Sequence, residues 1–146
     1  MSDLLHITGL DVSFPSQVET IFAVREVSIT LKPGEVLGVV GESGAGKSTI
    51  GNAIINLLEP PGEITKGKII LQGQNLIDLS DKEMRDIRGK KVGMIFQDPQ
   101  TSLNPLMTIG KQLSETLIET LKISGASARD KSIELLDSVG IPNSEA

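Results

Sequence analysis

The stretch GESGAGKS, from Gly41 to Ser48, decides the fold of this chain because it fits the pattern Gly-x-x-x-x-Gly-Lys-[Ser/Thr]. Polyphosphate oxygens require many donors at close range. Glycines let successive backbone N–H groups turn inward where a Cβ atom would block the approach. A helix that begins at this point adds its free N–H groups and the positive end of its dipole. The pattern therefore predicts a loop that holds the phosphates of a nucleotide.

The residues at the end of this loop fit the same chemistry. Lys47 supplies a point charge that can reach the terminal phosphates, and the Ser48 hydroxyl can complete a Mg²⁺ shell of water and phosphate oxygens. The nucleotide-binding residues expected from the loop are Gly41, Glu42, Ser43, Gly44, Ala45, Gly46, Lys47, Ser48 and Thr49.

The segments that flank the loop predict a strand and a helix. Residues 36–40 are apolar on both faces, as in a central strand of a parallel sheet. From Lys47 to Leu58 apolar residues recur at helical spacing, and Pro60 and Pro61 end the pattern. A glycine-rich turn between a buried strand and an amphipathic helix is the context that a phosphate loop needs.

Further strands are expected on both sides of this unit. Alternating apolar residues predict strands over Leu4–Phe14 and Val27–Leu31, and a Pro-Gly turn follows at 32–35. Lys68–Leu71 and Lys91–Phe96 have the same character. The last of these strands runs directly into a polar glutamine.

Other sequence patterns, namely helix caps and helical spacing of apolar residues, predict the helices. Residues 80–83 form a capping box that predicts a short helix to about Arg88. Apolar residues at helical spacing predict a helix over Thr108–Lys122. A second box-like cap at Ser127 predicts another helix, which Gly140 ends. Strands and helices thus alternate before Gln97, and only helices are expected after it.

The composition excludes several classes of function. The net charge is −5 with scattered basic residues, and Trp and Tyr are absent, which argues against a nucleic-acid partner. Cysteine is absent, which fits a reducing compartment. The start MSDLLHITGL is no secretory signal, and no apolar run approaches the ~18 residues of a membrane span. We therefore expect a cytoplasmic chain.

Two enzyme classes carry such a loop, namely small-molecule kinases and the ATPase subunits of ABC transporters. In the kinases the loop commonly follows the first strand of the chain. ABC ATPases place an antiparallel β-subdomain ahead of it. Here about 40 residues with at least two strands precede the loop, which favours the second class.

Residues 38–49, GVVGESGAGKST, and 94–105, MIFQDPQTSLNP, resemble the ATP-binding subunits of the ABC importers for oligopeptides, dipeptides and nickel. The resemblance runs from about Leu4 to Ile141. It implies an ATPase that binds ATP and Mg²⁺ and energises import of a peptide or related small solute. It also implies membrane subunits and a second, head-to-tail ATPase subunit as partners, at the inner face of the cell membrane. Neither nucleic acid nor a transmembrane segment of its own is expected.

The resemblance also implies a role for Gln97. The fold that the resemblance implies is α/β, and in it residues 1–97 form the nucleotide-binding core with its β-subdomain. Residues 98–146 would then form the Q-loop and the beginning of a helical subdomain. Gln97 begins the hinge between them and, with Lys47, is expected to be catalytic. Its amide oxygen suits Mg²⁺, which it would hold together with Ser48, and it can position the attacking water. The stretch after it would contact the membrane subunits.

An aromatic residue is expected to stack on the adenine. Family members place one at a position that Phe14 resembles. Phe22 is the competing candidate, because the segment between the two leaves the register open. A role of Phe14 as a core residue at a strand end is the alternative, and His6 is expected to lie on a strand surface without a function.

Three elements of the family pattern are absent from the 146 residues. The sequence has no Leu-Ser-Gly-Gly-Gln signature, no apolar run ending in Asp-Glu, and no histidine besides His6. All three lie further downstream in the family. We therefore expect the N-terminal portion of a longer protein, truncated before the signature and the Walker B strand. A nucleotide-binding fragment without turnover is the non-enzyme alternative, and a DNA-repair ABC ATPase is a weaker one.

Overall fold

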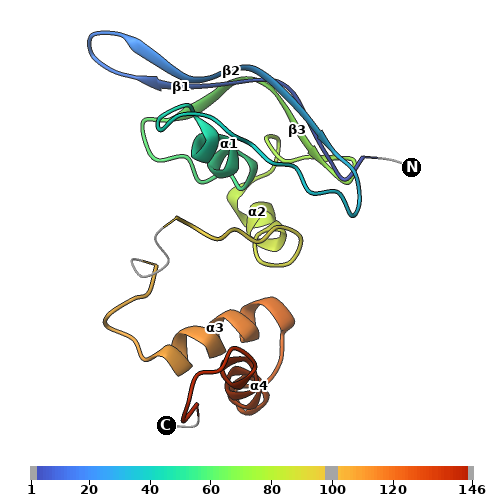
Figure 1. The fold of residues 1–146 in the computed structure, drawn as a ribbon, viewed down its shortest axis with the longest axis vertical. Coiled ribbons are helices and arrows are strands. Elements are labelled where there is room, and N and C mark those ends of the chain that lie inside the picture. The colour runs from blue at the N-terminus through green and yellow to red at the C-terminus, as the bar shows by residue number, and fades with distance from the viewer. Residues whose placement is uncertain (1–2, 98–101, 145–146) are drawn as a thin grey trace. The chain divides into compact units, whose positions relative to one another are not determined.

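The chain divides into two compact units, Met1–Val92 and Gly93–Ala146 (Figure 1). This computed structural model describes residues 3–97 and 102–144. Within these residues the first unit holds a four-stranded sheet and two short helices, and the second holds two longer helices. The domain boundary expected after residue 97 stays a prediction about the whole protein.

The sheet of the first unit has the strand order β2-β1-β3-β4, and every neighbouring pair is antiparallel. Its strands are β1 Leu5–Pro15, β2 Thr20–Leu31, β3 Glu63–Leu71 and β4 Gln74–Asn75. The strands predicted over Leu4–Phe14, Val27–Leu31 and Lys68–Leu71 are therefore confirmed, as parts of β1, β2 and β3. In Figure 1, helix α1, Lys47–Ile54, lies against one face of this sheet. The core between them and α2, Asp81–Ile87, includes Ile7, Leu10, Val12, Ala53, Ile69, Leu76 and Met84.

Two predicted strands are not found among the described residues. Residues 36–40 have no strand pairing, and in 91–96 only Val92 forms a single bridge, with Arg88. Val36 and Val40 are 95% and 93% exposed. A parallel strand needs hydrogen-bonded neighbours and cover on both faces. An apolar run predicts burial but supplies no partner strand, so the predictions of a central strand at 36–40 and of a strand at 91–96 are wrong for this chain.

The ends of the first two helices follow their local chemistry. Helix α1 ends at Ile54, earlier than the predicted Leu58, and Asn56 then takes a left-handed conformation with φ 51°. Helix α2 begins with the predicted capping box, in which Ser80 Oγ accepts from Glu83 N at 3.4 Å. The Glu83 carboxylate in turn accepts from Ser80 N at 2.8 Å and from the Ser80 hydroxyl. These bonds lower the pKa of Glu83, with the hydroxyl as the larger cause.

The second unit is a helix pair. Helix α3, Ile109–Leu121, begins after Thr108, whose Oγ1 accepts from Lys111 N at 3.3 Å. Helix α4, Gly125–Ser138, begins after Ser124, whose Oγ accepts from Ser127 N at 3.2 Å. The cap predicted at Ser127 is therefore wrong. Ser124 lies one turn earlier and accepts the hydrogen bond from Ser127 N, so the helix begins at Gly125.

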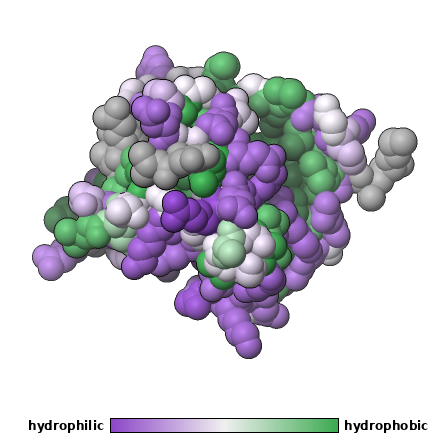
Figure 2. All heavy atoms as spheres, turned by 90° about the horizontal axis from the view of Figure 1, so that it is seen from below, coloured by the Kyte–Doolittle hydropathy of each residue, from purple (hydrophilic) through white to green (hydrophobic). Residues whose placement is uncertain are grey.

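The surface seen in Figure 2 mixes hydrophilic and hydrophobic side chains. Within residues 3–97 and 102–144, no helix has both the length and the apolar character to cross a membrane.

Candidate nucleotide-binding site

The predicted phosphate loop follows a path that glycine takes most readily. Gly44 and Gly46 have left-handed backbones, with φ 83° and 80°. Residues with a Cβ rarely adopt this conformation. Between them, Ala45 N donates to Glu42 O at 3.2 Å and closes a turn. The loop thus bends back on itself just before α1 begins.

Gly46 also brings the loop against the sheet. It is the N-cap residue of α1, and a Cβ atom at this position would come far closer than 3.0 Å to the carbonyl oxygen of Ala23 on β2. Cβ atoms in proteins essentially never approach another atom so closely. Glycine is therefore needed at residue 46 both for its conformation and for the space.

The charge and the donors of the loop meet at the first turn of α1. Lys47 Nζ donates to Gly41 O at 2.8 Å and to Glu42 O at 2.5 Å, so the ammonium group lies against the loop backbone. No described side chain caps this end of α1. The N–H groups of a first helical turn have no partner within the helix. Together with the exposed Ser48 they form a compact set of donors and positive charge, which fits a polyphosphate with its Mg²⁺.

Phe14 lies on the face of the sheet that carries the core. It follows Val12 by two residues on β1, so the two side chains point the same way. Its half-buried ring packs against the core and against Gly62, where a Cβ would lie 2.6 Å from the ring Cε1. Helix α1 contributes Ala53 to the same core. The packing role of Phe14 is therefore observed, and stacking on adenine stays a prediction.

Phe22 has different surroundings. It pairs with Ser13 across the two strands, whereas Phe14 pairs with Ile21. Phe22 is 40% exposed, and the Arg25 guanidinium lies 4.3 Å from the centroid of its ring. A cation over the ring leaves less of it for a base. Which of the two rings stacks on adenine therefore stays a prediction, with Phe14 as the expected one.

Gln97 is exposed and belongs to the second unit. The residues that follow it in the motif, Asp98 to Thr101, lie outside the described residues. The expected contribution of Gln97 to Mg²⁺ and water therefore stays a prediction.

The end of the same motif has a structural role that the sequence did not reveal. Gln112 on α3 accepts from Asn104 N at 3.0 Å and donates to Asn104 O at 3.1 Å and Met107 O at 3.0 Å. Asn104 Oδ1 accepts from Leu106 N at 2.9 Å. The Ser-Leu-Asn-Pro stretch is thus fixed to the start of α3. No spacing rule connects Gln112 with Asn104, so no sequence signal could have found this contact.

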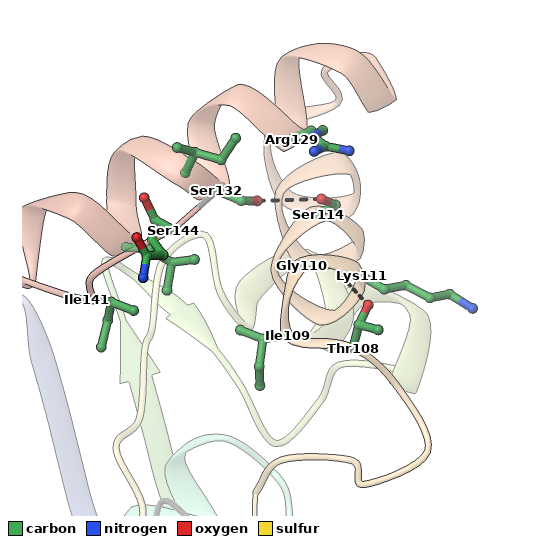
Figure 3. Close-up of a pocket in the computed structure, with 12 residues that line it drawn as sticks. Thr108, Ile109, Gly110, Lys111, Ser114, Arg129, Ser132, Ile141 and Ser144 are labelled. Carbon is green, nitrogen blue, oxygen red and sulfur yellow. Dashed lines mark hydrogen bonds between the residues drawn. The ribbon is translucent and has the colours of Figure 1, made fainter. Parts of the chain in front are cut away.

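A hollow lies within the second unit. Helices α3 and α4 and residues 141–144 surround an open space of about 540 Å³ (Figure 3). Beside it the Oγ atoms of Ser114 and Ser132 lie 3.5 Å apart, and the Ser132 hydroxyl also donates to Ala128 O at 2.7 Å. These polar groups are satisfied by the protein itself.

Comparisons with known proteins assign this arrangement of loop, helix and sheet to a family. Residues 24–146 match the family model described as ABC transporter, and the chain belongs to this family. Of the two enzyme classes that the sequence left open, this membership selects the ABC ATPases and excludes the small-molecule kinases.

The expected α/β fold is confirmed by a dimeric structure of a bacterial ABC transporter cassette. It matches with a TM-score of 0.79 and 30% identity, over 91% of this chain and 56% of that one. A second dimeric structure of this ATP-binding cassette, in a post-hydrolysis state bound to ADP and Pi, matches equally well.

Among curated proteins the chain is similar to peptide-transport subunits. The oligopeptide transport ATP-binding protein OppD of Bacillus subtilis (strain 168) is 48% identical over 143 residues, 97% of this chain and 40% of that protein. The dipeptide transport ATP-binding protein DppD of Escherichia coli (strain K12) is 42% identical over 140 residues, 96% of this chain and 43% of that protein. The chain thus spans 40% to 43% of the length of these relatives.

Proposed function

We propose that this chain is the nucleotide-binding part of an ATP-binding subunit of an ABC importer, which energises the uptake of peptides or a related small solute. The observation that carries the proposal is the geometry at the start of α1. There Lys47 Nζ, within 2.8 Å of Gly41 O, and an uncapped first turn form a site for a polyphosphate. The similarity to OppD and DppD supports a peptide as the transported solute.

The residues of the loop have distinct roles in this proposal. The glycine backbone of residues 41–46 and the first turn of α1 bind the phosphates. Lys47 neutralises charge on the terminal phosphates, and such electrostatic stabilisation, together with positioning, is what proteins contribute to phosphoryl transfer. Ser48 and Gln97 would hold Mg²⁺, which as a Lewis acid neutralises phosphate charge when bound. Phe14 would stack on the adenine.

The proposed partners are membrane subunits and a second ATPase subunit. The dimeric state of the similar cassette structure supports a second ATPase subunit, which would pair head to tail with this one. The stretch after Gln97 would contact the membrane subunits, with the chain at the inner face of the cell membrane. Residues 1–97 would be the nucleotide-binding core, and 98–146 the Q-loop and the start of the helical subdomain.

For the 146 residues by themselves we propose binding without turnover. No Leu-Ser-Gly-Gly-Gln signature and no apolar run ending in Asp-Glu occurs among them. Hydrolysis needs a group that positions or polarises the attacking water as well as charge stabilisation. The loop, Lys47 and Ser48 can hold the nucleotide, but positioning without the polarising group leaves little rate.

Isothermal titration of ATP into the chain and into Lys47→Ala tests the site. Charge-assisted hydrogen bonds contribute about 1.5–3 kcal/mol, so the variant should bind ATP roughly 10- to 150-fold more weakly. Lys68→Ala, which removes an exposed lysine of β3, is the control and should bind like the wild type. Equal affinity of Lys47→Ala and wild type would refute the phosphate loop.

The same proteins test the absence of turnover. Phosphate release by the chain should not exceed that of Lys47→Ala. Clear release that Lys47→Ala abolishes would show that the 146 residues hydrolyse ATP unaided.

A further inference from the structure

Arg88 holds the end of α1 that lies opposite the phosphate loop. Its Nε donates to Ile55 O at 2.7 Å and its Nη2 donates to Asn56 O at 2.8 Å. Ile55 is the C-cap of α1, and Asn56 is the left-handed residue that follows it. Carbonyls at the end of a helix lack partners within the helix. A planar guanidinium suits two such acceptors at once, because its donors point in fixed directions.

The charge of Arg88 complements the helix dipole. Helix α1 has no basic residue in its last turn, so a residue from outside the helix supplies the cation at its negative end. Arg88 is itself firmly held. It is the C-cap of α2, and its N–H donates to Met84 O at 2.9 Å. The side chain therefore joins the end of α2 to the end of α1.

Apolar packing also holds α1, since the C-cap Ile55 is buried and the helix packs on the core. Ala53 is the buried residue of this helix, and it has the smallest side chain that can pack. Ile50 and Ile54 are only partly buried. At the other end, Gly46 lies against the Ala23 carbonyl of β2. Since α1 has eight residues, its two ends are only about 12 Å apart. A shift at the Arg88 end therefore moves the first turn as well.

We propose that Arg88 is a positioning residue for the phosphate loop. By holding Ile55 O and Asn56 O it fixes the axis of α1, and thereby the direction in which Lys47 and the first-turn N–H groups point. Arg88 does not touch the nucleotide. The inference rests on the proposed binding of ATP by this loop, but the hold of Arg88 on α1 can be measured without nucleotide.

The test compares Arg88→Gln with Arg85→Gln in the full 146-residue chain. Arg85 lies on the same helix and is exposed, so its variant matches the change in charge. Hydrogen exchange without nucleotide should be faster in Arg88→Gln at the amides of α1 and unchanged at those of β1 and β3. Titration with ATP should give an affinity about 2- to 30-fold weaker, which is the size of effect that residues without ligand contact have on coupled sites. Arg85→Gln should match the wild type in both measurements.

Arg88→Lys provides a check against a merely structural role. A single ammonium keeps the charge but lacks the rigid fork. Exchange in α1 and ATP affinity should therefore both fall between those of wild type and Arg88→Gln. Unchanged α1 exchange in Arg88→Gln would overturn the proposal, as would equal acceleration in α1, β1 and β3. If the wild type binds no ATP, the proposed function fails while the exchange data still decide whether Arg88 holds α1.

Discussion

Replacing Gly46 by alanine should damage the site for two separable reasons. The left-handed conformation, with φ 80°, costs a residue with a Cβ about 1–2 kcal/mol. The new Cβ would also overlap the carbonyl oxygen of Ala23, and it would lie 3.3 Å from Val24 Cγ2. Forcing an extra methyl into a packed place typically costs about 1–3 kcal/mol. We therefore expect a total loss of about 2–5 kcal/mol, from the sum of these two ranges.

Gly44→Ala is the matched control for the conformational part. Gly44 has nearly the same backbone, with φ 83°, but nothing lies within 4 Å of a Cβ built on it. The free energy of unfolding of Gly44→Ala should fall only by the conformational cost of about 1–2 kcal/mol. Urea denaturation followed by circular dichroism gives both free energies of unfolding. Isothermal titration should then show weaker ATP binding by Gly46→Ala, because relief of the overlap displaces the loop from β2.

The difference between the two variants is the decisive quantity. Gly46→Ala should be less stable than Gly44→Ala by about 1–3 kcal/mol. Equal loss in the two variants would mean that the contact with Ala23 does not exist in solution, and the account of how the loop is held against the sheet would be wrong.

Two further predictions follow from the contacts of single side chains. Phe14→Ala should weaken ATP binding by about 1–3 kcal/mol if its ring stacks on adenine. Phe22→Ala should do less, and a larger effect of Phe22→Ala at equal stability would reverse the assignment. The lowered pKa of Glu83 means that its bonds to Ser80 stabilise the fold above the ordinary value of 4.5, and that this is lost as pH falls through the lowered pKa. Ser80→Ala should therefore lower the urea midpoint more at neutral pH than in acid below that pKa, and equal shifts would contradict this linkage.

The glycine-rich turn and the helix that follows it could be predicted from the sequence because their chemistry is local. Gly46 and Lys47 are neighbours, and the helix that they begin follows directly. The same holds for the box of Ser80 and Glu83, where three residues of separation bring each side chain to the other's backbone. In these cases sequence spacing and spatial distance are nearly the same quantity.

Contacts between distant residues could not be predicted in this way. Arg88 reaches Ile55 and Asn56 from another helix, and no periodic pattern links the three. Gln112 reaches back to Asn104 across a loop. The choice of Ser124 over Ser127 as the cap of α4 likewise depended on a competition between two similar serines, which the box-like pattern at Ser127 did not resolve.

The exposed segment 36–40 shows why an apolar pattern is an incomplete predictor of a strand. Its residues include Val36 and Val40, which are 95% and 93% exposed, and the segment lies directly before the glycine-rich turn of residues 41–46. The pattern reports that these side chains favour an apolar environment. A strand additionally requires a neighbouring backbone whose donors and acceptors match its own. The antiparallel sheet meets this requirement within the chain, since β1, β2 and β3 pair with one another. The segment before the loop does not, so the same kind of sequence gives a strand in one place and an unpaired segment in the other.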